Sequence, residues 1–297
     1  MTGSDSVISA RHLAQRYGKG RTIYEDLSFD VRKGSILGLL GKNGTGKTTT
    51  INILMGYLKP QQGECRIFGE DAFSISPITR ARIALLLEGH VQYGFMSISQ
   101  IERFYSAFYP RWNKDAYYEL MRKLQVSPKQ TISTMSCGQR SQVALGLILA
   151  QNADLLVLDD FSLGLDPGYR RLFTEYLREY AKAEEKTVFM TSHIIEDLER
   201  LIDDCIILDY GRILVQMPVS ELLQSFSRYT FKSEEGERLT DGKLLHTSQV
   251  RDACETYSFE NMEYVAEALD RNHICFSDLR RVKLSLEDAF IGLTGKY

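Results

Sequence analysis

The sequence of 297 residues predicts an α/β fold, and three observations carry this prediction. Residues 36–40 form an apolar run that is short enough for a buried strand. A glycine-rich loop and a helix-compatible run, residues 49–58, follow it directly. Residues 155–158 are apolar throughout, as expected for a parallel strand that is covered on both faces. Residues 188–190 add another central strand of the same kind.

The glycine-rich loop at residues 41–49 fits G-x-x-x-x-G-K-[ST], the phosphate-binding pattern of nucleotide hydrolases. A strand before the loop and a helix after it are the context that this pattern needs. Glycines let the backbone curl so that successive N–H groups point inward, and the helix N-terminus adds a partial positive charge. We expect Lys47 to reach the β- and γ-phosphates of a nucleoside triphosphate and the Thr48 hydroxyl to ligate Mg²⁺.

Composition excludes several other classes of protein. A net charge of -3 and an apolar fraction of 43% describe an ordinary soluble globular protein, without the polybasic field that nucleic acid attracts. No apolar run approaches the ~20 residues that span a bilayer, and the polar residues 1–6 predict no signal peptide. The five cysteines are scattered without a C-x-x-C pair, so we expect neither disulfides nor zinc, and a reducing cytoplasm.

Carboxylates follow two of the expected strands. Asp159 and Asp160 come directly after residues 155–158, at the sheet edge where ligands bind in open α/β folds. We expect Asp159 on the Mg²⁺ side and Asp160 to orient or deprotonate a water molecule. Glu88 follows the apolar residues 83–87 and is either a solvated strand end or a group that returns to the phosphates.

Three further positions have both a structural and a functional interpretation. Tyr17 is either a surface tyrosine or a ring that stacks on a purine. Ser136 precedes Gln139 by three residues, a capping-box pattern that predicts a helix start and is also suited to a second anion. His193 follows residues 188–190 and is either structural or a contact to the γ-phosphate.

Taken together, these motifs resemble the nucleotide-binding subunit of ATP-binding cassette (ABC) transporters over about residues 7–225. The motifs are, in chain order, the adenine-stacking aromatic at Tyr17, the Walker A loop at residues 41–49, the LSGGQ signature at residues 135–139, Walker B at residues 155–160, the D-loop at residues 165–166 and the switch histidine at His193.

The resemblance implies a P-loop NTPase cassette in residues 1–225, made of a RecA-like core, an antiparallel β subdomain and a helical subdomain at about residues 90–150. A small α+β accessory domain is expected at residues 226–297. The tail at residues 286–295 looks like that of the ATPase subunits of bacterial ABC-2-type exporters.

The resemblance also implies the ligands, ATP and Mg²⁺, and the residues that hold them. The implied catalytic residues are Lys47, Asp160 and His193, and the implied Mg²⁺ ligands are Thr48, Glu88 and Asp159. The implied ATP contacts are Tyr17, Gly41, Asn43, Gly44, Thr45, Gly46, Lys47, Thr48, Thr49, Ser136, Gly138, Gln139 and Asp166.

The implied partners are a second cassette and a membrane protein. Two subunits, either identical or related, are expected to pair head to tail, so that each signature helix caps the ATP held by its partner. A transmembrane permease encoded separately is expected to dock on the helical insert, which would hold the chain at the cytoplasmic face of the membrane.

The sequence departs from the family pattern at three places. Glu88 stands where many cassettes have glutamine, and Cys137 replaces the first signature glycine. Asp160 stands where the catalytic glutamate is expected, with Phe161 in place of proline. An aspartate is one methylene shorter, and misplacement of about 1 Å costs on the order of a hundredfold in rate.

Three functions follow from these motifs. The first is an ATPase that drives an exporter. The second, which the aspartate at position 160 suggests, is a slow or degenerate cassette that acts as a dimerisation switch beside a more active partner. The third, a soluble cassette in translation or DNA repair, is disfavoured because the chain has one Walker A loop and no long coiled-coil insert.

Overall fold

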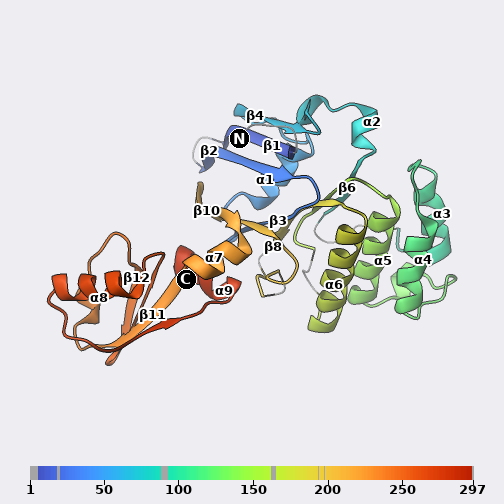
Figure 1. Cartoon of the computed structure of the whole chain (residues 1–297). Helices are drawn as coiled ribbons and strands as arrows, with labels where there is room; N and C mark the ends of the chain where they lie inside the picture. The colour runs from blue at the N-terminus through green and yellow to red at the C-terminus, as the bar shows by residue number, and fades with distance from the viewer. Residues whose placement is uncertain are drawn as a thin grey trace. The chain divides into compact units, whose positions relative to one another are not determined.

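The computed structural model in Figure 1 describes residues 6–18, 21–87, 93–161, 165–192, 194–196 and 198–295. The chain divides into two compact units, Met1–Val215 and Gln216–Tyr297. This division falls earlier than the predicted boundary at residue 225. The reason is that helix α7 (Val219–Ser225) lies against α9 (Leu286–Thr294), so it belongs to the C-terminal unit.

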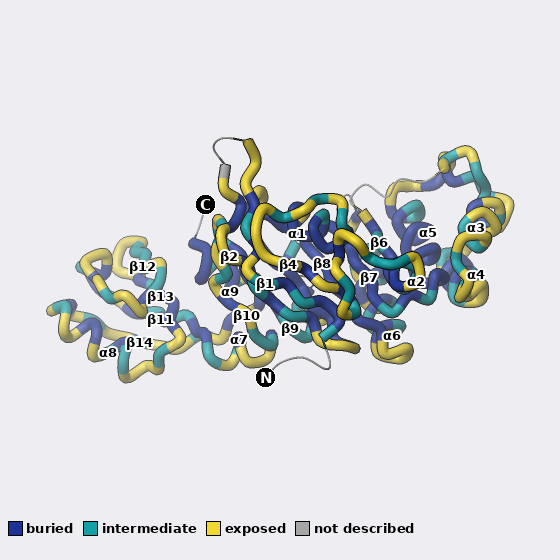
Figure 2. The backbone as a smooth tube through the Cα atoms, turned by 90° about the horizontal axis from the view of Figure 1, so that it is seen from above, coloured by how far each residue is buried: buried dark blue, intermediate teal, exposed yellow. Residues whose placement is uncertain are grey.

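A six-stranded sheet forms the centre of the N-terminal unit, in the order β10-β9-β3-β8-β7-β6. Its strands are β3 (Ile36–Gly41), β6 (Ile83–Leu86), β7 (Leu155–Leu158), β8 (Thr187–Ser192), β9 (Asp204–Asp209) and β10 (Arg212–Pro218). The strands from β9 to β6 in this order run parallel. Every residue of β3, β7 and β8 is buried, which confirms the strands predicted from their apolar runs. Figure 2 shows dark blue, buried backbone around the labels of β7 and β8.

A second, antiparallel sheet packs on the first through one shared hydrophobic cluster. Its strands, in the order β2-β1-β4-β5, are β1 (Ser6–Tyr17), β2 (Arg21–Arg32), β4 (Gln62–Ile67) and β5 (Glu70–Asp71). Along β2, the buried residues Leu27, Phe29 and Val31 alternate with less buried ones, and the Phe29 ring stacks on Phe189 of β8 at 5.8 Å. The antiparallel subdomain is therefore confirmed.

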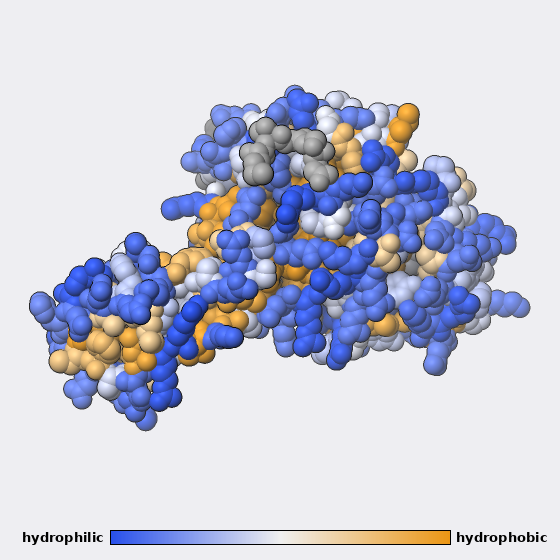
Figure 3. Space-filling view, in the orientation of Figure 1, coloured by the Kyte–Doolittle hydropathy of each residue, from blue (hydrophilic) through white to orange (hydrophobic). Residues whose placement is uncertain are grey.

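Helices α3 to α6 gather on one side of the N-terminal unit in Figure 1. The bounds of the helices described in this unit are α1 (Lys47–Leu54), α2 (Pro77–Arg80), α3 (Ile98–Ser106), α4 (Lys114–Lys123), α5 (Cys137–Ala150) and α6 (Pro167–Ala183). In the helical subdomain, Tyr117 of α4 is fully buried beside Gly146 of α5, and its hydroxyl donates to the Ile98 carbonyl at 3.0 Å. Over this subdomain, the face drawn in Figure 3 is mostly hydrophilic.

Helix α1 is shorter than the predicted run at residues 49–58, which was wrong at its C-terminal end. The helix stops at Leu54 because Gly56 adopts a left-handed conformation, with φ of 70°. The chain then turns back, and the Tyr57 N–H donates to the Asn52 carbonyl at 2.9 Å. A left-handed glycine just past the last turn is a common helix terminator.

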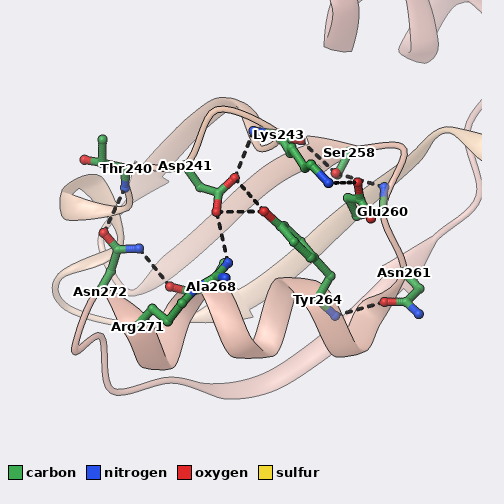
Figure 4. Close-up of polar contacts among 10 residues, drawn as sticks. All are labelled: Thr240, Asp241, Lys243, Ser258, Glu260, Asn261, Tyr264, Ala268, Arg271 and Asn272. Atoms are coloured by element: carbon green, nitrogen blue, oxygen red, sulfur yellow. Dashed lines mark hydrogen bonds and ion pairs between the residues drawn. The ribbon is translucent and has the colours of Figure 1, made fainter.

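The C-terminal unit has a four-stranded antiparallel sheet and a hydrophobic cluster of its own. The elements are β11 (Ser227–Lys232), β12 (Leu245–Val250), β13 (Ala253–Ser258), α8 (Met262–Arg271) and β14 (Ser277–Val282), and the strand order is β12-β13-β11-β14. Figure 4 shows how the loop before β12 is tied to α8. The Asp241 carboxylate accepts hydrogen bonds from the Tyr264 hydroxyl at 3.1 Å and from Arg271 at 3.2 Å.

Candidate nucleotide-binding site

The phosphate loop between β3 and α1 is curled by two left-handed glycines, Gly44 and Gly46, with φ of 81° and 107°. The Thr45 backbone N–H and hydroxyl both donate to the Lys42 carbonyl, at 3.3 and 2.8 Å, and close the turn. A side chain at position 46 would place its Cβ 2.5 Å from Cγ2 of Ile23, on β2. The loop therefore requires glycine here for its backbone angle and for its contact with the antiparallel sheet.

Lys47, the first residue of α1, is buried, and its ammonium donates to the carbonyls of Gly41 and Lys42 at 2.7 and 3.2 Å. The positive charge is thus held against the loop backbone. Tyr24 of β2 packs on Gly46 beside Ile23, and burial raises the pKa of its hydroxyl far above the usual range. A neutral phenol next to the loop adds no negative charge that would repel phosphate.

The remaining predicted loop residues differ in exposure. Asn43, Gly44 and Thr48 are exposed, whereas Gly41, Thr45, Gly46 and Thr49 are buried. Exposed residues on the loop can meet a ligand from solution, and the buried ones hold the loop on the sheet and helix behind it.

Asp159, directly after β7, lies beside the first turn of α1. The residue is 3% exposed, and its Oδ1 accepts hydrogen bonds from the Thr191 hydroxyl at 2.7 Å and the Thr48 hydroxyl at 3.4 Å. Thr48 and Asp159 are 111 positions apart in the chain, so the parallel sheet brings them together as the strand-end rule predicts.

The oxygens of Thr48 and Asp159 fit a magnesium ion, which prefers hard oxygen ligands. Within the ranges that the structure describes, no group of three or more His, Cys, Asp and Glu side chains could hold a metal. Magnesium commonly binds nucleotides through one or two carboxylates together with phosphate oxygens and water, so a large cluster of protein ligands is not required.

Asp160 has an unusual backbone, with φ of 41°. Its N–H donates to the Thr191 hydroxyl at 3.1 Å, and the next residue, Phe161, is fully buried with its ring 4.5 Å from that of Phe173 on α6. Aspartate is among the few residues other than glycine that enter left-handed regions readily. The conformation therefore suits aspartate better than the longer glutamate expected from the family pattern.

Tyr17 is the last residue of β1 and lies next to α1, although the two are far apart in sequence. Its hydroxyl is 3.4 Å from the Thr49 hydroxyl, and the residue is 47% exposed. The ring is thus beside the phosphate loop and accessible to a planar ligand, which keeps the predicted contact with a purine open.

The signature segment begins α5 with a complete capping box. The Ser136 hydroxyl accepts from the Gln139 N–H at 3.2 Å, and the Gln139 side-chain oxygen accepts from the Ser136 N–H at 3.1 Å. Ser136 itself is exposed, as is Cys137. The predicted helix start is confirmed, and its exposed end is accessible to another molecule.

Gly138 is buried against α6. A Cβ at this position would lie 2.3 Å from the Tyr169 ring. Tyr169 is held from two sides, because its N–H donates to Asp166 at 3.1 Å and its carbonyl accepts from Gln142 at 3.1 Å. Asp166, predicted as an ATP contact, is thus the N-cap of α6, and the glycine at position 138 is required for packing within the chain.

Two predicted residues, Glu88 and His193, lie outside the described residues. Sequence patterns missed Thr191, which contacts both aspartates, and Ile23 and Tyr24, which pack on the loop. The available signal for Thr191 was a hydroxyl directly after the apolar residues 188–190.

The phosphate loop, the paired carboxylates and the two sheets together form a nucleotide-binding cassette. Residues 24–162 match the family model described as ABC transporter. The chain is 31% identical over 227 residues to "Nod factor export ATP-binding protein I" of Ralstonia nicotianae, which covers 74% of this chain and 70% of that protein. It is 29% identical over 226 residues to "Bacitracin transport ATP-binding protein BcrA" of Bacillus licheniformis, covering 75% and 74% of the two chains.

Similarity extends through the C-terminal unit in another relative. "Uncharacterized ABC transporter ATP-binding protein YhcH" of Bacillus subtilis is 27% identical over 285 residues, which covers 94% of this chain and 93% of that protein. The solved structure of cbiO1 from Clostridium perfringens shares the fold, with a TM-score of 0.64 at 22% identity over 74% of this chain and 92% of that chain.

This chain belongs to the family of ABC transporter ATP-binding proteins. Members of this family bind ATP and are generally ATPases. Across the segments that the structure describes, no helix is both long and apolar enough to cross a membrane.

Replacing Gly46 with alanine tests the loop geometry. Gly46→Ala must place a Cβ against Ile23 at a φ that L-residues avoid, so we expect ATP affinity to fall at least about tenfold through local strain of 1–3 kcal/mol. Binding of a fluorescent ATP analogue measures this. Gly34→Ala is the matched control, because Gly34 also has positive φ, 72°, but no atom within 4 Å of the added Cβ. Equal losses of affinity in both variants would contradict the prediction.

Proposed function

We propose that this chain is the ATP-hydrolysing subunit of an ABC exporter and that its ATP-driven dimerisation drives a separate transmembrane permease. The observation that carries this proposal is the meeting of Thr48 and Asp159 beside the phosphate loop that holds Lys47, with Asp160 next to Asp159 in the chain. Two of the relatives are named for Nod factor export and bacitracin transport, which supports the export class.

The chemistry proposed for this site is positioning and charge stabilisation, which dominate phosphoryl transfer. Lys47 would neutralise phosphate oxygens, and Asp160 would orient or deprotonate the attacking water. Thr48, Asp159 and Glu88 are the residues that would hold Mg²⁺, which when bound neutralises charge that develops on the phosphates. His193 is proposed to contact the γ-phosphate.

The proposed dimer is head to tail, between two copies of this chain or with a related cassette. Ser136, Gly138, Gln139 and Asp166 would then complete the ATP site of the partner subunit. The exposed N-terminus of α5 supports this arrangement, since a helix N-terminus favours an anion. Ser136 remains exposed although its hydroxyl takes part in the capping box.

The proposed permease contact is a groove of about 590 Å³ between the core and the helical subdomain. Aromatic residues line it, and Tyr57 and Phe108 are 62% and 65% exposed. An apolar groove of this kind suits an amphipathic helix of a partner. The family consists of ATP-binding subunits of transporters, so we assign the occupant as a helix of the permease and place the chain at the cytoplasmic membrane face.

The second candidate is a slow or degenerate cassette that dimerises on ATP beside a more active partner. The observation that favours it is Asp160, which stands where the family pattern has glutamate. The transport and export names of the relatives favour both of these functions over a role in translation or DNA repair.

Removing the loop lysine tests the proposed function. Lys47→Ala should reduce Mg-ATP hydrolysis by the purified protein about a hundredfold or more, the order seen when one charge-stabilising donor is removed. Lys59→Ala, at an exposed lysine outside the loop, is the control and should hydrolyse ATP like the wild type. A wild-type rate no higher than that of Lys47→Ala would refute the ATPase proposal for the homodimer.

Lengthening the acidic side chain separates the two candidates. We expect Asp160→Glu not to raise the hydrolysis rate, because φ at this position is 41° and suits aspartate better than glutamate. Asp160→Asn, which keeps the shape but removes the charge, should lower the rate about a hundredfold or more. A sharp increase with Asp160→Glu, measured as phosphate release, would instead support the slow switch.

A negative charge introduced into the signature segment, residues 135–139, tests the proposed dimer. Aspartate caps helices as well as serine, so Ser136→Asp should keep α5 intact while placing a negative charge opposite the partner's phosphate. We expect ATP-dependent dimerisation, measured by sedimentation, to weaken at least about tenfold, a cost of 1.4 kcal/mol. Ser97→Asp makes the same change in the capping box of α3 and should leave dimerisation unchanged. An unaffected Ser136→Asp dimer would exclude the head-to-tail arrangement.

A further inference from the structure

One hydroxyl group links the two adjacent aspartates of the site. Thr191 lies on β8, next to β7, and is fully buried. Its Oγ1 donates to Asp159 Oδ1 at 2.7 Å and accepts from the Asp160 backbone N–H at 3.1 Å. Because the hydroxyl donates to one neighbour and accepts from the other, its orientation is defined.

Thr191 is the nearer of two hydroxyl donors to the Asp159 carboxylate. The bond from Thr48 to the same oxygen is 3.4 Å long, against 2.7 Å from Thr191. Asp159 is 3% exposed, so its carboxylate depends on hydrogen bonds within the protein for its polar partners and for its orientation. Thr191 therefore determines how the carboxylate faces Thr48.

Thr191 also holds the backbone of Asp160, whose φ of 41° is a conformation that persists only when neighbours enforce it. Two contacts enforce the conformation here, one on each side of Asp160. The Thr191 hydroxyl binds the N–H of Asp160, and the stacking of Phe161 on Phe173 anchors the residue that follows.

We propose that Thr191 is a positioning residue for ATP hydrolysis, whose single hydroxyl aligns the Asp159 carboxylate with Thr48 and holds the Asp160 peptide in its left-handed conformation. This inference rests on the proposed ATPase function. Loss of the hydroxyl should therefore raise the Mg²⁺ concentration that hydrolysis requires and lower the rate of hydrolysis. The phosphate loop should still bind nucleotide through Lys47.

The chain offers a closely matched control on the same strand. Thr187 is also buried on β8, and its hydroxyl accepts a hydrogen bond from the Gly34 N–H at 3.0 Å. It lies at the other end of the strand, before Val188. Thr187→Val and Thr191→Val thus remove the same group from similar surroundings, and only Thr191→Val removes contacts to the aspartates.

The test uses the full-length protein and two measurements, ATP hydrolysis against Mg²⁺ concentration and binding of a fluorescent ATP analogue with Mg²⁺ or with EDTA. For Thr191→Val we expect the Mg²⁺ concentration at half-maximal rate to rise about tenfold and kcat to fall about 10–100-fold, as for other residues that orient metal ligands. Binding in EDTA should match the wild type. Thr191→Ser should recover most of the loss, and Thr187→Val should change neither quantity.

The outcomes decide between a positioning and a purely structural role. If Thr191→Val behaves like Thr187→Val in both measurements, or if Thr191→Ser is no better than Thr191→Val, the inference is wrong. If Thr191→Val does not fold, Thr191→Cys, which keeps a weak donor, should show an intermediate Mg²⁺ requirement, and a wild-type requirement would overturn the inference.

The experiment also distinguishes failure of the proposed ATPase function from failure of the inference about Thr191. A wild-type protein that does not hydrolyse ATP leaves the effect of Mg²⁺ on analogue binding as the deciding measurement. Thr191→Val should then lose that effect while Thr187→Val keeps it. A wild type whose binding does not respond to Mg²⁺ would also overturn the inference.

Discussion

The left-handed backbone of Gly46 is the constraint on which the site depends. It lets the chain leave β3, curl round the loop and begin α1 at Lys47 within a few residues. Ile23 of β2 packs so closely on Gly46 that no Cβ fits between them. The antiparallel sheet therefore shapes the phosphate loop directly, and the hydrophobic cluster that the two sheets share keeps β2 in place.

The order of the parallel strands then determines what faces the loop. In the strand order β3-β8-β7, the loop follows β3, Thr191 is the last residue but one of β8, and Asp159 follows β7. Three neighbouring carboxyl ends thus place a hydroxyl between the lysine-bearing loop and the acidic pair. Buried polar groups of this kind are stabilising only when each finds a partner, and Thr191 supplies partners to both aspartates.

Much of this arrangement could be predicted from the sequence, because local patterns determine it. The loop motif, the apolar strands and the S-x-x-Q capping box each depend on residues close together in the chain, and the strand-end rule placed Asp159 near Thr48. The left-handed turn at Asp160, the contacts of Thr191 with both aspartates and the fit of Gly138 on Tyr169 could not be predicted. They depend on contacts between segments whose spacing in the chain is unrelated to their spacing in the fold.

The contact between Gly138 and Tyr169 gives the signature glycine a packing role within its own chain. Its lack of a side chain lets α5 approach α6 within a single chain, at a distance that even a methyl group would not allow. Selection for a folded monomer alone would therefore keep glycine at this position, even in a cassette that had lost every use for nucleotide. A glycine preserved here is evidence of helix packing first, and only secondarily of a second phosphate contact.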